Sequence, residues 1–377
     1  MKQIPQLYES NTNAAYASIL GSLPDAIKCE VTEERNGDFY CEMTYPARGM
    51  NAKLISVGRI IMVPPNPYDN AQAFRIATIE KSLDGTMDIT AYHISYDMAN
   101  MVVMPFIVSN SVSACNALTG AAVPGADFLI TTDIINQTAF EVKQPTLLKP
   151  LLVGMEGSLV DTYGGELKFD NWNVSLLQNR GQIRNVQIAY GKNLTGFIET
   201  DEIAKYDGVV PFAVFDNVTY YLAGSEYPTA PIVWANGTGP IYSYPRLLPL
   251  DMSDKYTEAA PTKAQLYADA QSYIRQHNTA ATANMSTEYV DLAKLLGHNE
   301  RVDLCDTVYI TVTPFNIYNL TSKVISITYD VLTDENIKVE IGDKKITLAD
   351  TLAQTIIAAE QKVPGKINLP NADVIRY

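Results

Sequence analysis

The chain has 377 residues, of which 47% are apolar and 19% are charged, a composition typical of a globular protein with one or more apolar cores. Its 28 basic and 42 acidic residues give a net charge of −14, which argues against a dedicated nucleic-acid binder because phosphate groups require a positive surface. The longest apolar stretch, near residues 98–108, is interrupted and too short to cross a bilayer, and the N-terminus has no apolar signal core. We therefore expect no membrane anchor and no sequence-specific contact with nucleic acid.

Residues 1–105 predict a first antiparallel β-barrel domain, because short alternating strands follow one another with turn signals between them. The first two strands, near residues 27–31 and 39–45, flank the turn residues Asn36, Gly37 and Asp38. A three-residue loop of Asn36-Gly37-Asp38 places both apolar sets on one face and pairs Val31 with Met43. Further strands are expected over 53–63, 73–81 and 87–96.

That register also predicts the positions of two cysteines and one glycine. Cys29 and Cys41 are four residues out of step, or about 13 Å apart at roughly 3.3 Å per residue, which is too far for a disulfide. Both are therefore interpreted as small apolar side chains. Gly37 is expected to adopt a positive φ, so Gly37→Val should destabilise the protein.

Residues 106–204 predict an α+β domain with a helix near 111–119 and a long hairpin. The hairpin is expected to join 174–176 to 186–190 through a five-residue loop, with a β-bulge at Asp170-Asn171. Residues 205–284 predict a Tyr- and Pro-rich domain with a helix capped by Thr262.

The last part of the chain returns to a β pattern. Residues 285–346 predict a second β-barrel region with strands near 306–313, 322–331 and 337–341. Residues 347–377 predict a C-terminal helix that begins at Thr347, followed by a truncated linker. The fold class is therefore a β-rich α+β multi-domain protein, in which two antiparallel β-barrel domains are accompanied by smaller α/β domains. The two barrel regions could be copies of one kind of barrel, although no sequence repeat shows it.

The residue pattern contains no catalytic, metal or cofactor signature. The three histidines have no paired spacing, and His93 in an expected strand is interpreted as structural or surface-exposed. The four residues Tyr190, Gly191, Lys192 and Asn193 lack the spacing of a phosphate-binding loop and are interpreted as a turn after a strand. We expect no catalytic, metal or cofactor-binding residues, and the missing enzyme signals favour a structural or interaction protein.

Several blocks of sequence, in the order that the family has, resemble the tail-tip or tail-associated lysin proteins of Gram-positive siphophages and prophages, often called phage minor structural proteins. The blocks are Asp25–Tyr40 with Met43–Gly49, Phe74–Ile76 with Ala91–Asp97, Gly164–Trp172 with Ile188–Leu194, and Tyr289–Ala293 with Arg301–Val308 and Lys323–Leu332. Together they extend over most of residues 5–350.

The resemblance implies a fold similar to the baseplate-hub proteins of contractile tails and a place at the tail tip of the virion. In such hubs a homotrimer forms a six-barrel ring that closes the tail tube. The ring binds the distal tail protein and the C-terminus of the tape-measure protein. Full-length members often carry a C-terminal module that contacts or degrades the host cell wall, and such a module is expected to be missing here. The turns at Asn36-Gly37-Asp38 and Tyr190-Gly191-Lys192-Asn193 would then fix strand register.

Two other functions remain open from the sequence. The chain could be a cell-wall peptidase or lysin, which would need a site among three histidines and four cysteines. It could also be a wall-glycan or receptor-binding module that uses the Tyr-rich stretch 220–244, since sugars stack on aromatic rings. A negative lumen in the ring, which would limit the sticking of DNA, is a further hypothesis based on the −14 charge.

Overall fold

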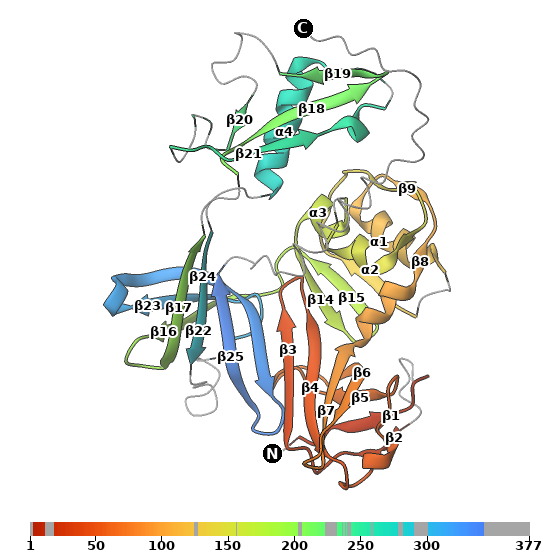
Figure 1. The fold of residues 1–377 in the computed structure, drawn as a ribbon, viewed down its shortest axis with the longest axis vertical. Coiled ribbons are helices and arrows are strands. Elements are labelled where there is room, and N and C mark those ends of the chain that lie inside the picture. Colours follow the sequence, from red (N-terminus) through yellow and green to blue (C-terminus); the bar gives the residue numbers. More distant parts are fainter. Residues whose placement is uncertain are drawn as a thin grey trace. The chain divides into compact units, whose positions relative to one another are not determined.

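The structure is a computed structural model (Figure 1). It describes residues 3–11, 19–123, 127–155, 157–202, 206–222, 232–235, 237, 239, 243–257, 259–277, 282–289 and 301–342. The chain divides into two units, residues 1–343 and 344–377, and all the described residues belong to the first. The helix predicted to begin at Thr347 lies outside the described residues. The finer division of the chain into five parts stays a prediction.

Most of the described chain is β-structure. The N-terminal strands are β1 (Gln6–Tyr8), β2 (Ile19–Ser22), β3 (Lys28–Glu34), β4 (Phe39–Pro46), β5 (Ile60–Val63), β6 (Gln72–Lys81) and β7 (Thr86–His93), followed by the 3₁₀ segment η2 (Ile94–Asn100). The C-terminal strands are β16 (Ile183–Ala189), β17 (Leu194–Glu202), β22 (Thr282–Tyr289), β23 (Thr307–Val312), β24 (Ile317–Asp330) and β25 (Glu335–Gly342).

These two groups of strands form one continuous sheet of 13 strands rather than two separate barrels. The order is β17-β22-β25-β24-β3-β4-β7-β6-β5-β1-β2, and β23 and β16 continue from β24. Figure 1 shows the blue strands β24 and β25 beside the red strand β3. Within the described residues no ladder joins β2 to β3 or β16 to β17, so neither group closes into the barrel that the sequence predicted.

A smaller α+β region lies between the two groups in the sequence. It contains β8 (Val102–Val103), β9 (Phe106–Val108), α1 (Ser111–Gly120), β10 (Ala122–Val123), β11 (Leu129–Thr132), β12 (Phe140–Val142), β13 (Thr146–Leu147), α2 (Leu148–Leu152), α3 (Leu159–Tyr163), β14 (Glu166–Asp170) and β15 (Asn173–Leu177). Helix α1 agrees with the predicted helix and begins at Asn110, whose side chain accepts a bond from the Ser113 N–H.

A further region is inserted between β17 and β22. Its elements are β18 (Gly208–Phe215), β19 (Val218–Tyr221), β20 (Val233–Trp234), β21 (Leu247–Asp251) and α4 (Lys263–His277). Helix α4 begins as predicted after Thr262, because the Thr262 hydroxyl accepts from the Gln265 N–H and the Gln265 side chain accepts from the Thr262 N–H. The region has its own apolar core, which includes Val209, Leu250 and Leu266.

The first hairpin shows the predicted face but a different register. Cys29, Val31, Phe39, Cys41 and the other inward residues are buried together, as the alternation predicted. However, Val31 pairs with Cys41 and not with Met43, because the three-residue loop is Arg35-Asn36-Gly37 and Glu34 bonds to Asp38. Cys29 and Cys41 are consequently diagonal neighbours with sulfur atoms 3.9 Å apart, so the predicted separation of about 13 Å was wrong.

The second predicted hairpin is also wrong. Strand β15 pairs with β14 across a two-residue turn at Asn171-Trp172, where the sequence analysis expected a bulge. Asn171 supplies the positive φ of 54° that this turn needs. Strand β16 pairs with β23 in parallel, so residues 178–182 connect two different sheets. The strand expected over 53–63 is shorter, because Ala52–Leu54 form a 3₁₀ turn before β5.

Candidate functional site

A polar cavity of about 200 Å³ lies where β3, β14, β24 and the segments 65–69, 180–184 and 301–306 meet. It is lined by Glu33, Pro65, Asn66, Asp69, Lys168, Arg180, Gln182, Arg184, Arg301, Asp303, Leu304, Asp306 and Ile327. Because eight of these residues are ionisable, the cavity could be a ligand site or a structural junction. The partners of each charge distinguish the two.

Among the ion pairs of the described residues, the most buried joins Arg180 to Glu33. The guanidinium donates to both carboxylate oxygens, over 2.7 and 2.9 Å, and both side chains are only 8% exposed. Arg180 also donates to the Leu167 carbonyl. Burial alone would lower the pKa of Arg180, but the adjacent Glu33 carboxylate raises it. This fork-shaped pair fixes the 180–184 segment to the first strand of the sheet.

Glu166, at the start of β14, connects three more parts of the chain. Its carboxylate accepts from the Arg180 N–H and from the Lys323 ammonium group of β24, and it lies 3.8 Å from the Arg35 guanidinium. Burial raises the pKa of Glu166, but these donors lower it more, so the pKa lies below its usual value. Glu166 therefore holds β14, β24 and the β3–β4 turn together as a carboxylate.

A second group of charged residues that line the cavity is centred on Asp306. The buried Asp306 carboxylate accepts from the Gln182 N–H, the Asp303 N–H and the Arg184 side chain, over 2.7 to 2.9 Å. Arg184 and Arg301 both pair with Asp303. Burial raises the pKa of Asp303 although Arg301 opposes the shift. These contacts attach the start of β16 to the segment that leads into β23.

The same segment requires glycine at position 181. A Cβ atom there would lie closer than 3.0 Å to backbone atoms of Cys305 and Asp306. Cys305 itself has a positive φ of 69°, and its N–H donates to the Val324 carbonyl. The two chain segments are therefore in backbone contact at this point, with no space for a side chain.

The first predicted turn motif lies beside this junction, and Asn36 does more than form a turn. Asn36 has the positive φ, 54°, that the sequence analysis assigned to Gly37, and Gly37 has no such conformation. The Asn36 amide donates to the Gly165 carbonyl and accepts from the Leu167 N–H. Asp38 accepts a hydrogen bond from the Tyr96 hydroxyl. The predicted strain at Gly37→Val was therefore assigned to the wrong residue.

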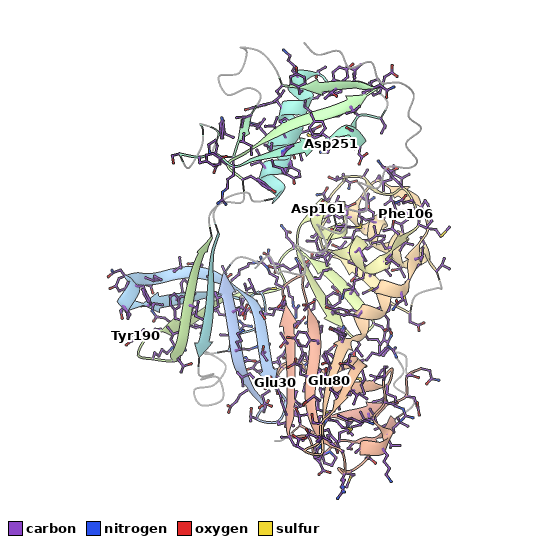
Figure 2. The ribbon with its side chains drawn as sticks, in the orientation of Figure 1. Glu30, Glu80, Phe106, Asp161, Tyr190 and Asp251 are labelled. Carbon is purple, nitrogen blue, oxygen red and sulfur yellow. The ribbon has the colours of Figure 1, made fainter. Side chains whose placement is uncertain are left out.

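The second turn motif lies at the end of β16, where Figure 2 labels Tyr190. Gly191 has a φ of 81°, and the Lys192 and Asn193 N–H groups both donate to the Ala189 carbonyl. The Asn193 side chain accepts from the Ala189 N–H. The four residues are thus placed in a turn, and the Lys192 ammonium group donates to the Gln187 carbonyl.

His93 is fully buried, next to three aromatic rings. It stacks on Phe39 at 4.4 Å, and its Nδ1 accepts from the Ser95 N–H, which places the proton on Nε2, facing the Gln72 side-chain oxygen. Burial and the nearby Lys149 lower the pKa of His93 well below its usual value. It is a neutral structural histidine and not an accessible base. In the described ranges no three His, Cys, Asp or Glu side chains are grouped as metal ligands would be.

Lys149, whose charge acts on His93, has a lowered pKa as well. Its ammonium nitrogen lies 2.8 Å from the centre of the Tyr96 ring, and burial lowers its pKa to about 7 although Asp38 opposes the shift. The contact attaches α2 to η2. Of the helices that the structure describes, none is long and apolar enough to cross a membrane.

The arrangement of the cavity residues is that of a junction. The carboxylates of Glu33, Asp303 and Asp306, which line the cavity, are each bonded to an Arg side chain, and the carboxylate of Glu166 is bonded to Lys323. Residues far apart in sequence, from 33 to 323, are joined there. Sequence reasoning did not find this network, because Arg180 and Gly181 lie in a segment that its pattern marks only as a loop. The one available signal was the charge density of residues 301–306.

Comparison with known proteins supports a phage-tail relationship. A family described as "Prophage endopeptidase tail" matches residues 236–352. The fold is similar to prophage tail protein gp18 from Listeria monocytogenes (12% identity, TM-score 0.54, covering 95% of this chain and 100% of that one). It is also similar to a 43 kDa tail protein of prophage MuSo2 from Shewanella oneidensis (12%, 0.59, covering 91% and 98%).

A third similar structure is the tail protein from Neisseria meningitidis (7% identity, TM-score 0.57, covering 90% of this chain and 96% of that one). No curated protein sequence matches the chain. The resemblance to phage tail-associated proteins that the sequence blocks indicated is confirmed by the family match and the shared fold. A restriction to Gram-positive phages is not supported, because two of these folds come from Gram-negative bacteria.

Proposed function

We propose that this chain is a structural component of a prophage tail, located at the tail tip of the virion, where three copies form a ring that closes the tail tube. The partners of the ring are the distal tail protein and the C-terminus of the tape-measure protein. A C-terminal module would connect it to the host cell wall. The observation that carries the proposal is the continuous sheet of two strand groups, in which the buried Glu33–Arg180 pair joins β3 of the first group to the segment that leads into β16 of the second.

A rigid sheet built from two strand groups suits a ring subunit, because each group can serve as one segment of the circumference. The charge network supports this role, since its members are bonded to one another and none is presented as a free acid or base. The −14 net charge would favour a lumen that does not retain DNA.

The experiment is to induce the prophage, purify the tails, and locate the chain by gold labelling of an affinity tag in electron micrographs. Label at the tail tip, with co-purification of the distal tail protein, supports the proposal. Label along the tube, or a chain absent from purified tails, contradicts it.

We also propose that the chain is not itself an enzyme, although the description of the matched family contains the word endopeptidase. We expect the purified chain to leave peptidoglycan intact in turbidity and zymogram assays. Lysis by the purified chain would support the peptidase alternative, and binding of labelled host walls would support the glycan-binding one.

A further inference from the structure

The two strand groups have the same connection order. In chain order, β3, β4, β5, β6 and β7 of the first group correspond to β17, β22, β23, β24 and β25 of the second. In the sheet the orders are β3-β4-β7-β6-β5 and β17-β22-β25-β24-β23, and all four neighbouring pairs are antiparallel in both. The flanking strands differ, since β1 is antiparallel to β5 and β16 is parallel to β23.

The groups are joined within the chain by one strand pair, β3 with β24. Glu30–Glu34 of β3 lie opposite Ser326–Asp330 of β24. The ladder is bounded by the bonds from the Arg35 N–H to the Ile325 carbonyl and from the Val331 N–H to the Cys29 carbonyl. On β24 this pairing begins where the pairing with β23 ends, on the edge opposite β25.

Because the strands of the two groups match in order, the edges of β3 and β24 that pair with each other have equivalents in the other group. The strand equivalent to β3 is β17, which pairs with β22 on one side and has no second ladder among the described residues. The strand equivalent to β24 is β6, which pairs with β5 only over Gln72–Arg75. Over Thr78–Lys81 it pairs with β7 alone, and Glu80 of this part is labelled in Figure 2.

The direction of the backbone groups on β6 follows from its hydrogen bonds. Ile76 exchanges bonds with Gly58 and Arg59 on the β5 side, and a bulge follows between Ile76 and Thr78. The Ser82 N–H donates to Thr86 on the β7 side. Because strand residues alternate between edges, Ile79 and Lys81 present their N–H and C=O groups to the unpaired edge.

We propose that β17 of one copy pairs with the Ile79–Lys81 edge of β6 in the next copy, repeating between chains the β3–β24 junction that joins the two groups within one chain. The inference rests on the proposed ring and names its interface. The contact is heterologous, since each copy offers β17 on one side and β6 on the other, and such a contact generates the proposed ring when the rotation between successive copies closes after three.

The sequences of the two edges suit this pairing. The last five residues are Glu-Val-Thr-Glu-Glu in β3 and Ile-Glu-Thr-Asp-Glu in β17, so both strands end in a threonine followed by two acidic residues. The receiving edge carries Lys81, which is exposed. Neither β17 nor β6 contains a proline, one of the residues that protect a solvent-facing edge strand. Ile198 of β17 is 65% exposed in the single chain.

The test is light scattering of the full chain with one edge blocked at a time. Ile79→Pro and Lys81→Pro remove edge-facing N–H groups from β6, and Ile79→Val and Lys81→Ala are the matched controls that keep them. For β17 the variants are Ile198→Pro and Glu199→Pro, because the N–H groups of successive strand residues face opposite edges and one of these two faces the unpaired edge. Their controls are Ile198→Val and Glu199→Gln. Circular dichroism and thermal melting identify which variants remain folded.

We expect the wild type and the controls to have the mass of three chains. Each folded β6 variant should have the mass of one chain, and so should the folded β17 variant whose N–H faces the unpaired edge. A β6-edge variant mixed with a β17-edge variant should give a dimer of two chains, because only one complementary pair of edges remains. Folded edge variants that keep the wild-type mass would overturn the pairing and leave the ring proposal standing. A wild type that stays monomeric at high concentration would overturn both the pairing and self-assembly of the ring, but not the location in the tail.

Discussion

Replacing Gly181 by alanine tests the junction most directly, because the structure leaves no space for one methyl group. The new Cβ would lie closer than 3.0 Å to backbone atoms of Cys305 and Asp306, and ordinary contact requires about 3.5 to 4.0 Å. The two segments must therefore separate by roughly 1 Å or more. That shift stretches the bonds from the Gln182 N–H to Asp306 and from the Thr307 N–H to the Gln182 carbonyl, which are 2.7 and 2.8 Å long.

The cost can be estimated from those bonds. A neutral buried hydrogen bond contributes about 1 kcal/mol, and a bond to a charged group about 1.5 to 3 kcal/mol. Weakening both, together with the Arg184–Asp306 pair, gives an expected loss of about 3 to 5 kcal/mol in the free energy of unfolding. Urea denaturation followed by circular dichroism measures it.

The matched control is Gly120→Ala at the end of α1. No atom lies within 4 Å of a Cβ at that position and its φ is not positive, so alanine should be neutral or stabilising by up to about 1 kcal/mol. A Gly181→Ala protein that loses less than about 1 kcal/mol would refute the close backbone contact at Cys305.

Three other variants test the same junction. Glu33→Leu leaves the buried Arg180 guanidinium without its carboxylate partner, so we expect the free energy of unfolding measured in urea to fall by about 3 to 5 kcal/mol. The control Glu42→Ala removes the exposed Lys28–Glu42 pair and should cost less than about 1 kcal/mol; equal losses would contradict the argument. Asn36→Ala should lower the free energy of unfolding by about 1 kcal/mol more than Asn36→Gly, because both variants lose the bonds to Gly165 and Leu167 but only alanine is strained at a φ of 54°. The reverse order would show that this backbone conformation is not retained. The folded protein holds His93 neutral with a lowered pKa, whereas the unfolded chain takes up the proton near the usual pKa of 6.5, so the free energy of unfolding should fall as the pH drops below 6.5. His93→Phe should reduce the slope of that dependence between pH 6.5 and 5, and an unchanged slope would assign it to other groups.

Local structure could be predicted from the sequence where it depends on nearby residues alone, such as an apolar alternation or a helix cap. Alternation placed Cys29, Val31, Phe39 and Cys41 on one buried face, and Thr262 marked the start of α4. The register failed by two residues because parity alone allows either pairing, and the choice depended on which residue adopts the left-handed conformation. Asparagine at position 36 does so, since its amide is held by the backbone of Gly165 and Leu167, more than a hundred residues away in sequence.

The long-range pairings could not be predicted, because hydrophobic periodicity identifies strands and not their partners. Nothing local distinguishes a β15–β16 hairpin from the observed pairings of β15 with β14 and β16 with β23. The same limit applies to the candidate site. Arg180 and Glu33 are 147 positions apart, and each looks like an ordinary surface charge in its own segment.

The region between β17 and β22 has a consequence for how such chains diversify. Glu202 and Thr282 are paired in the ladder, so everything from 203 to 281 begins and ends at adjacent positions of one hairpin. The elements within it have a separate apolar core, built from residues such as Val209, Leu250 and Leu266. A replacement of that region by a short turn, or by another domain whose termini lie close together, leaves the ladder and the junction at Arg180 intact. We therefore expect the sheet to tolerate exchange of the inserted region.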